Sequence, residues 1–358
     1  MRCAIDDPWC KIGPFGVAAL CIHELSDGSN PTWAIVCPLL MSHPQDEVSL
    51  HTGSMVCVLI CTYQGESFLS EQLDSIAEQT HSRWSVVVSD DGSTDETQAI
   101  LDRYQKLWSA ARLMAVRGPS AGFAANFRSL TCHTEIDAEF FAWADQDDIW
   151  QCEKLQRALA WLQSVPVDVP ALYGTRTLLT NADDQPIGMS PLFTKPPGFA
   201  NALVQCIAGC NTMVFNRAAR ELFVEASSKG DAVAPDWLLY LLVSGCGGRV
   251  HYDPWPSVRY RQHGQNLSGS NLSLGGRWRR ARLLMAGEFR GWVDANLERL
   301  ARVRHRMPEH NVAVLDAFVQ ARQRRLPDRL IGFLRSGIHR QTALGNLGLA
   351  VAALFNKL

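Results

Sequence analysis

This 358-residue chain lacks the features that mark several classes of protein. No apolar run approaches the roughly 18 residues that a membrane-spanning helix needs, and no secretion signal is visible at the start. The eleven cysteines form no CxxC pair and no regular framework. This distribution predicts free thiols in a reducing cytoplasm and no zinc site. A GxxxxGK[ST] loop and a GxGxxG after the first strand are also missing, so the usual nucleotide-binding folds are poor alternatives.

Net charge is small, at −2, but it is unevenly distributed. Residues 277–358 carry 15 arginines and one lysine against six acidic residues, a balance of +10, and the rest of the chain carries −12. This predicts an electrostatic partner for the C-terminal region, either an anionic membrane surface or nucleic acid. The alternative is a solvated basic helical face. GRWRRARLLMAGEFRGW at 276–292 mixes arginine with large apolar residues, as an interfacial helix does, and 342–355 is a second such candidate.

The first part of the chain shows no sustained period and contains four of the cysteines. We expect residues 1–54 to be a disordered extension, or the product of a start codon upstream of a true start near Met41 or Met55. We expect the main domain at residues 55–270, with a nucleotide-binding half at 55–150 and an acceptor half at 151–270. A basic helical C-terminal region should follow at 271–358.

From Val56 onward, strand and helix patterns alternate four times. Apolar runs such as VCVLICTY (56–63) and WSVVVSD (84–90) are typical of buried strands, and apolar residues at helical spacing follow each. The alternation predicts an α/β fold, with a mostly parallel sheet flanked by helices and a helical tail. Such sheets bind ligands at the carboxyl ends of their strands. Polar groups that end three strands should therefore converge on one edge: Thr62, Tyr63, Asp90, Asp91 and Asp145–Asp148.

The segment EFFAWADQDDIW (139–150) crowds Asp145, Asp147 and Asp148 behind a buried strand. Repulsion and desolvation disfavour that arrangement unless something positive sits among the carboxylates. Magnesium is usually held by one or two carboxylates and substrate phosphates, so the turn predicts a metal–phosphate site. The alternative is an N-cap cluster for a helix at 152, which suits Asp148.

A second acidic loop, VVVSDDGSTDET (86–97), has a simple local explanation in part. Asp-Gly is typical of a turn, and Ser93 followed by Glu96 predicts a capping box for the next helix. This does not explain Asp90, which ends a buried strand. A carboxylate there could accept a hydrogen bond from a pyrimidine ring or a ribose hydroxyl.

Three segments in order, VLICTYQGESFLSEQLDSIAEQT, VVVSDDGSTDET and WADQDDIW, resemble glycosyltransferase family 2, the inverting enzymes of the GT-A fold. The resemblance covers about residues 56–265 and implies a metal-dependent enzyme with a nucleotide-sugar donor. It implies that Thr62 and Tyr63 contact the nucleoside and that Asp90 or Asp91 reads the pyrimidine edge. It also implies that Asp145 approaches the ribose and that Asp147, with Asp145, ligates Mg²⁺ or Mn²⁺; which acid of each pair makes which contact stays open.

An inverting transfer also needs a base for the acceptor hydroxyl. PDWLLYLL (235–242) supplies Asp236 where members of this family place that carboxylate; the alternative is an N-cap. Burial would raise its pKa and the helix N-terminus would lower it, so the balance is open. In YRQHGQNLSG (260–269), Arg261 and His263 suit phosphate oxygens, and the resemblance implies that His263 faces the diphosphate or the metal.

Within this family, the chain is most similar to bacterial rhamnosyltransferases. The similarity lies in AGCNTMVFNR (208–217) and in the combination DWLLYLL…YDP…YRQHGQN. This implies dTDP-L-rhamnose as donor and a lipid-linked O-antigen or capsule glycan, built on polyprenyl diphosphate, as acceptor. We therefore expect a cytoplasmic enzyme, peripheral on the inner membrane through its basic tail, and no nucleic-acid partner, because the carboxylates repel phosphates. The alternatives are a UDP-sugar donor, a nucleotidyltransferase, or a non-catalytic sugar-nucleotide-binding protein.

Overall fold

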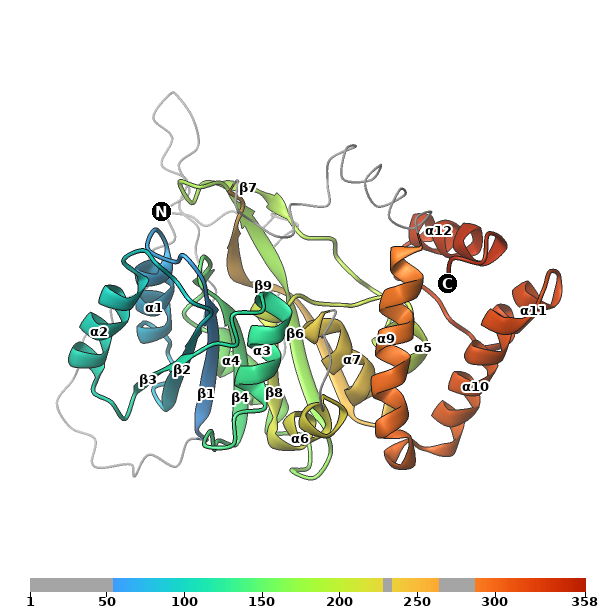
Figure 1. The fold of residues 1–358 in the computed structure, drawn as a ribbon, viewed down its shortest axis with the longest axis horizontal. Helices are drawn as coiled ribbons and strands as arrows, with labels where there is room; N and C mark the ends of the chain where they lie inside the picture. The colour runs from blue at the N-terminus through green and yellow to red at the C-terminus, as the bar shows by residue number, and fades with distance from the viewer. Residues whose placement is uncertain (1–53, 228–233, 264–286) are drawn as a thin grey trace, which may run out of the picture. The chain divides into compact units, whose positions relative to one another are not determined.

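The computed structural model describes residues 54–227, 234–263 and 287–358, all within the unit that begins at Gly53 (Figure 1). The expected extension at 1–54 lies outside the described residues except for Ser54, and so does most of the arginine-rich segment at 276–292.

The described chain is built on one sheet, in the order β3-β2-β1-β4-β8-β6-β9-β5, with β7 paired to β6. The strands are β1 (Val56–Thr62), β2 (Trp84–Asp90), β3 (Leu113–Arg117), β4 (Phe140–Asp145), β5 (Ile149–Trp150), β6 (Ala171–Thr180), β7 (Pro186–Met189), β8 (Val214–Asn216) and β9 (Arg249–Arg261). Strands β1 to β4 are parallel, as the alternation predicts. Beyond β4 the sheet is mixed, because β8 runs antiparallel to both β4 and β6, whereas β6 and β9 are parallel.

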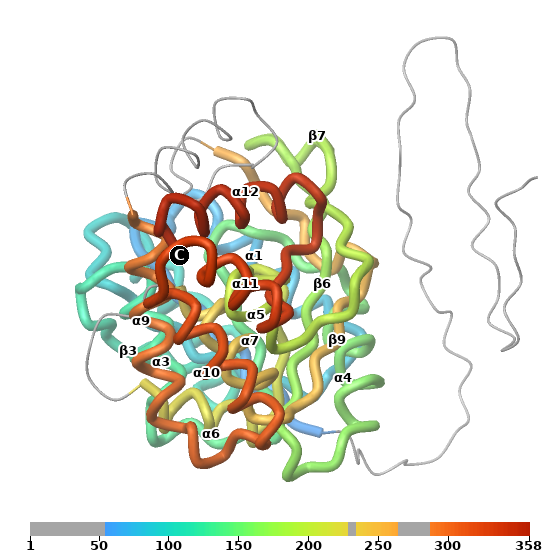
Figure 2. The backbone as a smooth tube through the Cα atoms, turned by 90° about the vertical axis from the view of Figure 1, so that its right-hand side faces the viewer, coloured from blue at the N-terminus to red at the C-terminus, as the bar shows by residue number. Residues whose placement is uncertain are grey.

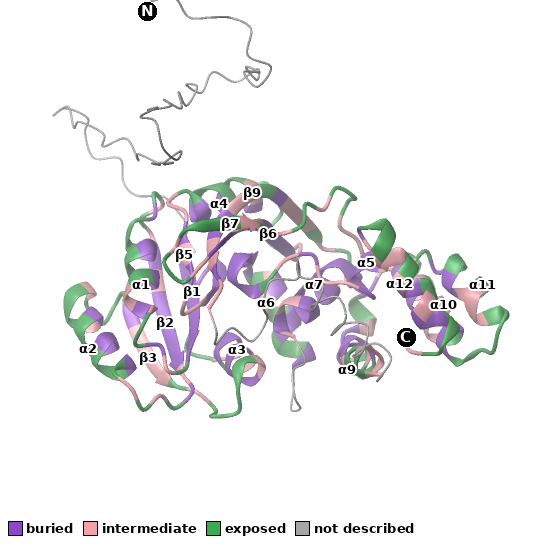
Figure 3. Ribbon diagram, turned by 90° about the horizontal axis from the view of Figure 1, so that it is seen from above, coloured by how far each residue is buried: buried purple, intermediate pink, exposed green. Residues whose placement is uncertain are grey.

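Helices cover both faces of the sheet, which confirms the predicted fold class (Figures 1 and 3). One face packs against α1 (Leu69–Ala77), α2 (Thr97–Trp108) and α4 (Lys154–Leu162). The other packs against α3 (Phe123–Thr131), α5 (Phe199–Ala202), α6 (Arg217–Ala226) and α7 (Pro235–Gly245). The two short 3₁₀ turns are η1 (Cys210–Thr212) and η2 (Arg304–Arg306).

The alternation of side chains along β1 explains why two separate cores form. Val56, Val58 and Ile60 point into the core under α1, whereas Cys57 and Leu59 point into the core under α3 and α7. Every residue of β1 is buried. A strand apolar on both faces is the expected signature of a parallel sheet covered on both sides, so the sequence pattern and the layer arrangement agree.

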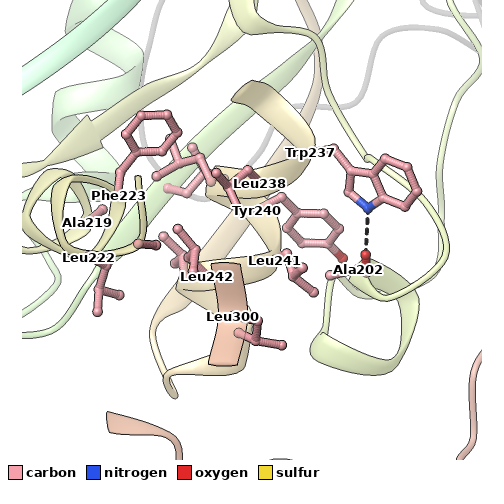
Figure 4. Packing of buried hydrophobic residues seen from close by; sticks show 14 of the residues in the cluster. Ala202, Ala219, Leu222, Phe223, Trp237, Leu238, Tyr240, Leu241, Leu242 and Leu300 are labelled. Carbon is pink, nitrogen blue, oxygen red and sulfur yellow. Dashed lines mark hydrogen bonds between the residues drawn. The ribbon is translucent and has the colours of Figure 1, made fainter. Parts of the chain in front are cut away.

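Helix α7 is buried almost all round, which explains why PDWLLYLLVSG shows no polar stripe. Figure 4 shows Trp237, Leu238, Tyr240 and Leu242 of this helix packed against neighbouring elements. The Trp237 indole N–H donates to the Ala202 carbonyl oxygen at 2.7 Å, and the Gly198 N–H donates to the Tyr240 hydroxyl at 2.9 Å. These bonds fix the start of the helix, and with it Asp236.

The predicted capping box at the start of α2 is wrong. The Ser93 hydroxyl donates to Asp90 at 2.5 Å, and the helix begins only at Thr97. The N-cap residue is Glu96, which makes no side-chain capping bond, and the Asp95 carboxylate accepts from the Thr97 N–H at 3.1 Å and the Thr97 hydroxyl at 2.5 Å. Asp90 therefore competes successfully for the hydroxyl that the capping box requires.

The predicted helical C-terminal region is confirmed. It consists of α9 (Glu288–Arg302), α10 (Glu309–Gln323), α11 (Asp328–Arg335) and α12 (Ala343–Leu354). Leu300, Phe318 and Phe333 extend the core that also contains α7. Among the described residues, no helix is long and apolar enough to cross a membrane.

Candidate active site

The carboxyl ends of β1, β2 and β4 meet at one edge of the sheet. In the register of these parallel strands Thr62 lies opposite Asp90, and Cys61 lies opposite Asp145. The structure therefore brings the polar strand ends together as the sequence predicts.

The loops that follow β1 and β2 are joined by reciprocal hydrogen bonds. The Gly65 N–H donates to the Thr97 hydroxyl at 2.8 Å, and the Glu66 N–H donates to Asp95 at 3.0 Å. A side chain at Gly65 would not fit, since a Cβ there would lie 2.6 Å from Thr62 Oγ1. Hydrogen bonds thus hold the loop at 64–66 against the loop at 92–97, beside the strand ends.

Gln146, in the middle of the acidic turn, fastens that turn to the end of β1. Its Oε1 accepts from the Thr62 hydroxyl at 2.5 Å and from the Tyr63 N–H at 2.8 Å. Its Nε2 donates to the Tyr63 carbonyl oxygen at 3.0 Å. The Tyr63 side chain is 57% exposed, so an aromatic ring stands beside the turn with its surface open.

Asp90 and Asp91 have different surroundings, which separates two residues that the sequence leaves equivalent. Both carboxylate oxygens of Asp91 accept backbone N–H groups, from Ser120 at 2.7 Å and Gly122 at 2.8 Å. Asp91 therefore anchors the loop after β3. The Asp90 carboxylate accepts from the Ser93 N–H and hydroxyl of its own loop, and Asp90 lies beside Thr62.

Asp147 pairs with a residue far along the chain. His263 Nε2 lies 2.8 Å from Asp147 Oδ2, and the imidazole lies over Phe68 with ring centroids 4.8 Å apart. The segment after β1, which contains Phe68, and the segment after β9, which contains His263, therefore lie in contact.

Arg261 is turned toward protein groups. It is 3% exposed, its Nε donates to the Asp147 carbonyl oxygen at 3.3 Å, and it forms an ion pair with Glu71. Its guanidinium also lies 4.6 Å from the centre of the Phe68 ring. These contacts stabilise the acidic turn. Contact of Arg261 with phosphate stays a prediction.

A lysine of the chain itself lies beneath the acidic turn. Lys154 is fully buried, its Nζ donates to the Asn211 carbonyl oxygen at 2.5 Å, and it lies 4.0 Å from the centre of the Trp150 ring. Burial lowers the pKa of Lys154 to about 7, whereas attraction to Asp148 and Asp145 opposes that shift. A buried lysine therefore shares this region with the acidic side chains, and burial moves the pKa values of the lysine and of Asp148 toward each other.

Asp148 has a structural place in that arrangement. It is fully buried, and its Oδ2 accepts from Asn211 Nδ2 at 2.6 Å. Burial raises its pKa to about 8, and Lys154 opposes the rise. The alternative in which Asp148 caps the next helix is wrong, because α4 begins only at Lys154, after β5 has paired with β9.

Asp145 and Asp236 are near enough to interact electrostatically. Burial raises the pKa of Asp145 well above its usual range, and repulsion from Asp148, Asp147 and Asp236 adds to this. The Asp145 side chain has no hydrogen-bond partner in the part of the chain that the structure describes. Burial and the neighbouring acids thus favour the protonated form of the Asp145 carboxyl group.

Asp236 lies in the first turn of α7, behind Pro235, and Ala234 is the N-cap. The N-cap alternative for Asp236 is therefore wrong, although its Oδ1 accepts from the Trp237 N–H at 2.8 Å. Burial raises the pKa of Asp236 to about 6, and hydrogen bonds from backbone N–H groups oppose the rise. The effect of burial on the pKa of Asp236 is thus larger than the opposing effect of the helix N-terminus.

The donor set at this edge suits a hard divalent cation. Carboxylate oxygens of Asp145 and Asp147 and the imidazole of His263 are ligands that Mg²⁺ or Mn²⁺ accepts. Within residues 54–227, 234–263 and 287–358, however, no three His, Cys, Asp or Glu side chains are gathered closely enough to hold a metal by themselves. A cation here would need further ligands from a substrate.

Gln146, Lys154 and Asn211 were not anticipated from the sequence. Lys154 carries a recognisable signal, because it precedes Ala158 and Leu162 at spacings of four on the buried face of α4. A lysine in line with an apolar stripe indicates a buried charge. Gln146 and Asn211 carry no such signal, since their partners lie far along the chain.

An open hollow of about 430 Å³ lies elsewhere on the molecule, lined in part by Arg157, Trp161 and His251. Its residues stand near the starts of β6 and β9, whereas the acidic turn contacts the end of β9 through Arg261. The hollow is therefore separate from the site at the strand ends.

Comparison with known proteins agrees with this geometry. The family model described as glycosyl transferase family 2 matches residues 57–223. The dTDP-rhamnosyl transferase RfbG of Shigella flexneri is 27% identical over 255 residues, which are 68% of this chain and 84% of that protein. The UDP-Glc:alpha-D-GlcNAc-diphosphoundecaprenol beta-1,3-glucosyltransferase WfgD of Escherichia coli is 27% identical over 166 residues, 46% of this chain and 60% of that protein.

Among solved structures, the mannosyltransferase PcManGT from Pyrobaculum calidifontis, in complex with GDP-Man and Mn²⁺, is similar with 19% identity and a TM-score of 0.45. The similarity covers 86% of this chain and 85% of that one. The matched residues 57–223 contain the strand ends and the acidic turn described above. The chain therefore contains, at residues 57–223, a segment that matches glycosyl transferase family 2.

Proposed function

We propose that this glycosyltransferase moves L-rhamnose from dTDP-L-rhamnose to a hydroxyl of a growing cell-surface glycan, with inversion at the anomeric carbon. The observation that carries the proposal is the convergence of Thr62, Asp90 and Asp145 at the edge where β1, β2 and β4 end, with Asp236 near enough to raise the pKa of Asp145. One site thus holds carboxylates suited to a nucleoside diphosphate and, near them, a carboxylate suited to an acceptor.

The reaction assigns a step to Asp236. Its carboxylate takes the proton of the acceptor hydroxyl, the acceptor oxygen forms a bond to the anomeric carbon, and the bond from that carbon to the diphosphate breaks. The electron pair of the broken bond leaves with dTDP. A pKa of about 6 suits a base at neutral pH, because the group is ionised there and still basic.

The remaining residues hold the donor. We assign the base and ribose to Tyr63, Thr62 and Asp90, with Asp91 as the anchor of the neighbouring loop. Asp147, Asp145 and His263 would hold Mg²⁺ or Mn²⁺, which would offset the charge of the leaving diphosphate. Arg261 braces the turn from behind.

The donor and the acceptor of the relatives support different parts of the proposal. The name of RfbG supports dTDP-rhamnose, and the name of WfgD supports an acceptor on a polyprenyl diphosphate in cell-envelope glycan synthesis. WfgD is a UDP-Glc enzyme of equal identity, so a UDP-sugar is the second candidate donor. A lipid-linked acceptor would bring the chain to the inner face of the membrane, and the basic C-terminal region is compatible with that location.

A panel of donors tests this proposal. We expect purified protein with Mn²⁺ and a short-chain lipid-diphosphate acceptor to release dTDP from dTDP-L-rhamnose at least about tenfold faster than UDP from UDP-glucose. NMR of the product should show the anomeric configuration opposite to that of the donor. If only UDP-glucose were turned over, a UDP-sugar would be the donor instead of dTDP-L-rhamnose. Retention of the anomeric configuration would contradict the role of Asp236 as the base of an inverting transfer.

A further inference from the structure

The last helix presents an apolar face to solvent. Leu344, Leu347 and Phe355 are 60–64% exposed, and Leu354 is 45% exposed. Spacings of 3, 7 and 8 among them put these side chains on one side of α12. Leu349, Ala352 and Ala353, on the other side, are buried.

This exposed face lacks the polar residues that a helix on a protein surface normally carries. No charged residue occurs between Gln341 and Asn356. Helix α11 packs beside α12 and adds two exposed residues, Ile331 at 43% and Leu334 at 83%. Figure 2 shows α10, α11 and α12 on the side of the described chain that faces the viewer.

Positive charge predominates in the part of the chain that carries these apolar side chains. Residues 321–358 contain six arginines and one lysine against a single acid, Asp328. Arg324, Arg325 and Arg335 are exposed, and no acidic side chain in the described ranges forms an ion pair with them. We call α11, α12 and these three arginines the C-terminal face.

We propose that the C-terminal face docks on an anionic phospholipid surface, with the leucines in the interface and the arginines on lipid phosphates. Helix α12 has 12 residues, which is too short to span a bilayer but long enough to lie in its interface. This inference deepens the lipid-linked part of the proposed function and rests on it.

The charge distribution favours lipid over other occupants. A second copy of the chain docking through the same face would bring like charges together. Nucleic acid would pair with the arginines and leave the leucines without a partner. An anionic bilayer satisfies both kinds of side chain.

The test is flotation of the full chain with vesicles, without donor or acceptor. We expect binding to vesicles that contain about one third phosphatidylglycerol, weak binding to pure phosphatidylcholine, and loss of binding at high salt. The variant Leu344→Ser/Leu347→Ser should reduce binding at least about tenfold, and Arg325→Ala/Arg335→Ala should weaken it and flatten the salt dependence. The control is Leu107→Ser, an equally exposed leucine (71%) at the end of α2, which should bind like wild type.

Equal binding of the leucine variant and wild type would overturn the assignment of this face. A concentration-dependent dimer that this variant disrupts, with no vesicle binding, would assign the face to a second copy. Vesicle binding and donor turnover are measured separately, so a protein that turns over donor but does not float would sink this inference and leave the proposed function intact.

Discussion

Replacing Asp236 with asparagine is expected to lower the rate of transfer by about 10²–10⁴-fold. Asparagine keeps the size of the side chain but cannot take the proton of the acceptor hydroxyl. Donor affinity should change little, because the residues that we propose to bind the nucleotide lie at the ends of β1, β2 and β4. The measurement is the transfer rate at saturating donor, with binding of dTDP as the control.

The same substitution is expected to stabilise the protein at neutral pH. The folded-state pKa of Asp236 is raised, to about 6, so the folded protein holds this proton more tightly than the unfolded chain does. The stability that the proton contributes is complete below about pH 4 and lost as pH rises through 6. The ionised group then costs on the order of 3 kcal/mol. Thermal unfolding should therefore show Asp236→Asn more stable than wild type at pH 7.5 and equal to it at pH 4.

The pH dependence of transfer gives a second check on Asp236. The rate should be level above about pH 7 and fall about tenfold per unit below pH 6, because only the ionised carboxylate acts as a base. Residual activity of Asp236→Asn should lack this fall. A full rate in that variant, or the same fall in both proteins, would remove Asp236 from the reaction.

Replacing Lys154 with methionine is expected to destabilise the fold by about 1–3 kcal/mol. Methionine fills the space, but it leaves the buried Asn211 carbonyl oxygen without its donor and removes the group that opposes the raised pKa of Asp148 and of Asp145. Nucleotide binding should weaken as well, because Asp147 and Asp148 are neighbours in the same turn. The measurements are chemical unfolding and the affinity for dTDP.

The double variant Lys154→Met/Asp148→Asn is the matched control. Asparagine at 148 removes one of the two carboxylates beside the methionine, so the double variant should recover much of the lost stability. Asp148→Asn alone should cost less than Lys154→Met, because Lys154 then still faces Asp145. Strictly additive losses would show that Lys154 does not neutralise Asp148.

Local sequence patterns are enough to predict those strands and helices whose formation depends on residues close together in the chain. The doubly apolar run of β1 and the helical spacing after it predict covered parallel strands, and the acidic residues at strand ends then share an edge. The three-residue strand β8, which reverses the sheet direction, carries no comparable pattern because its pairing is decided by distant partners.

Long-range partners also limit what the sequence says about the site. The motif WADQDDIW indicates a charged turn, but only the fold shows that Lys154 lies beneath it and that Gln146 fastens it to Tyr63. The Ser93 hydroxyl is a similar case. Its spacing to Glu96 favours a cap, yet the nearby Asp90 is the better acceptor in the folded loop.

Calorimetric titration with dTDP, UDP and GDP, with and without Mn²⁺, tests most directly whether this edge is a nucleoside-diphosphate site. We expect dTDP to bind best, at least about tenfold more tightly with Mn²⁺ than without it, and Asp147→Asn to remove that gain. Preference for UDP would keep the site and change the donor. If none of the three nucleotides bound with either form of the protein, the carboxylates would be structural and the account of this site would be contradicted.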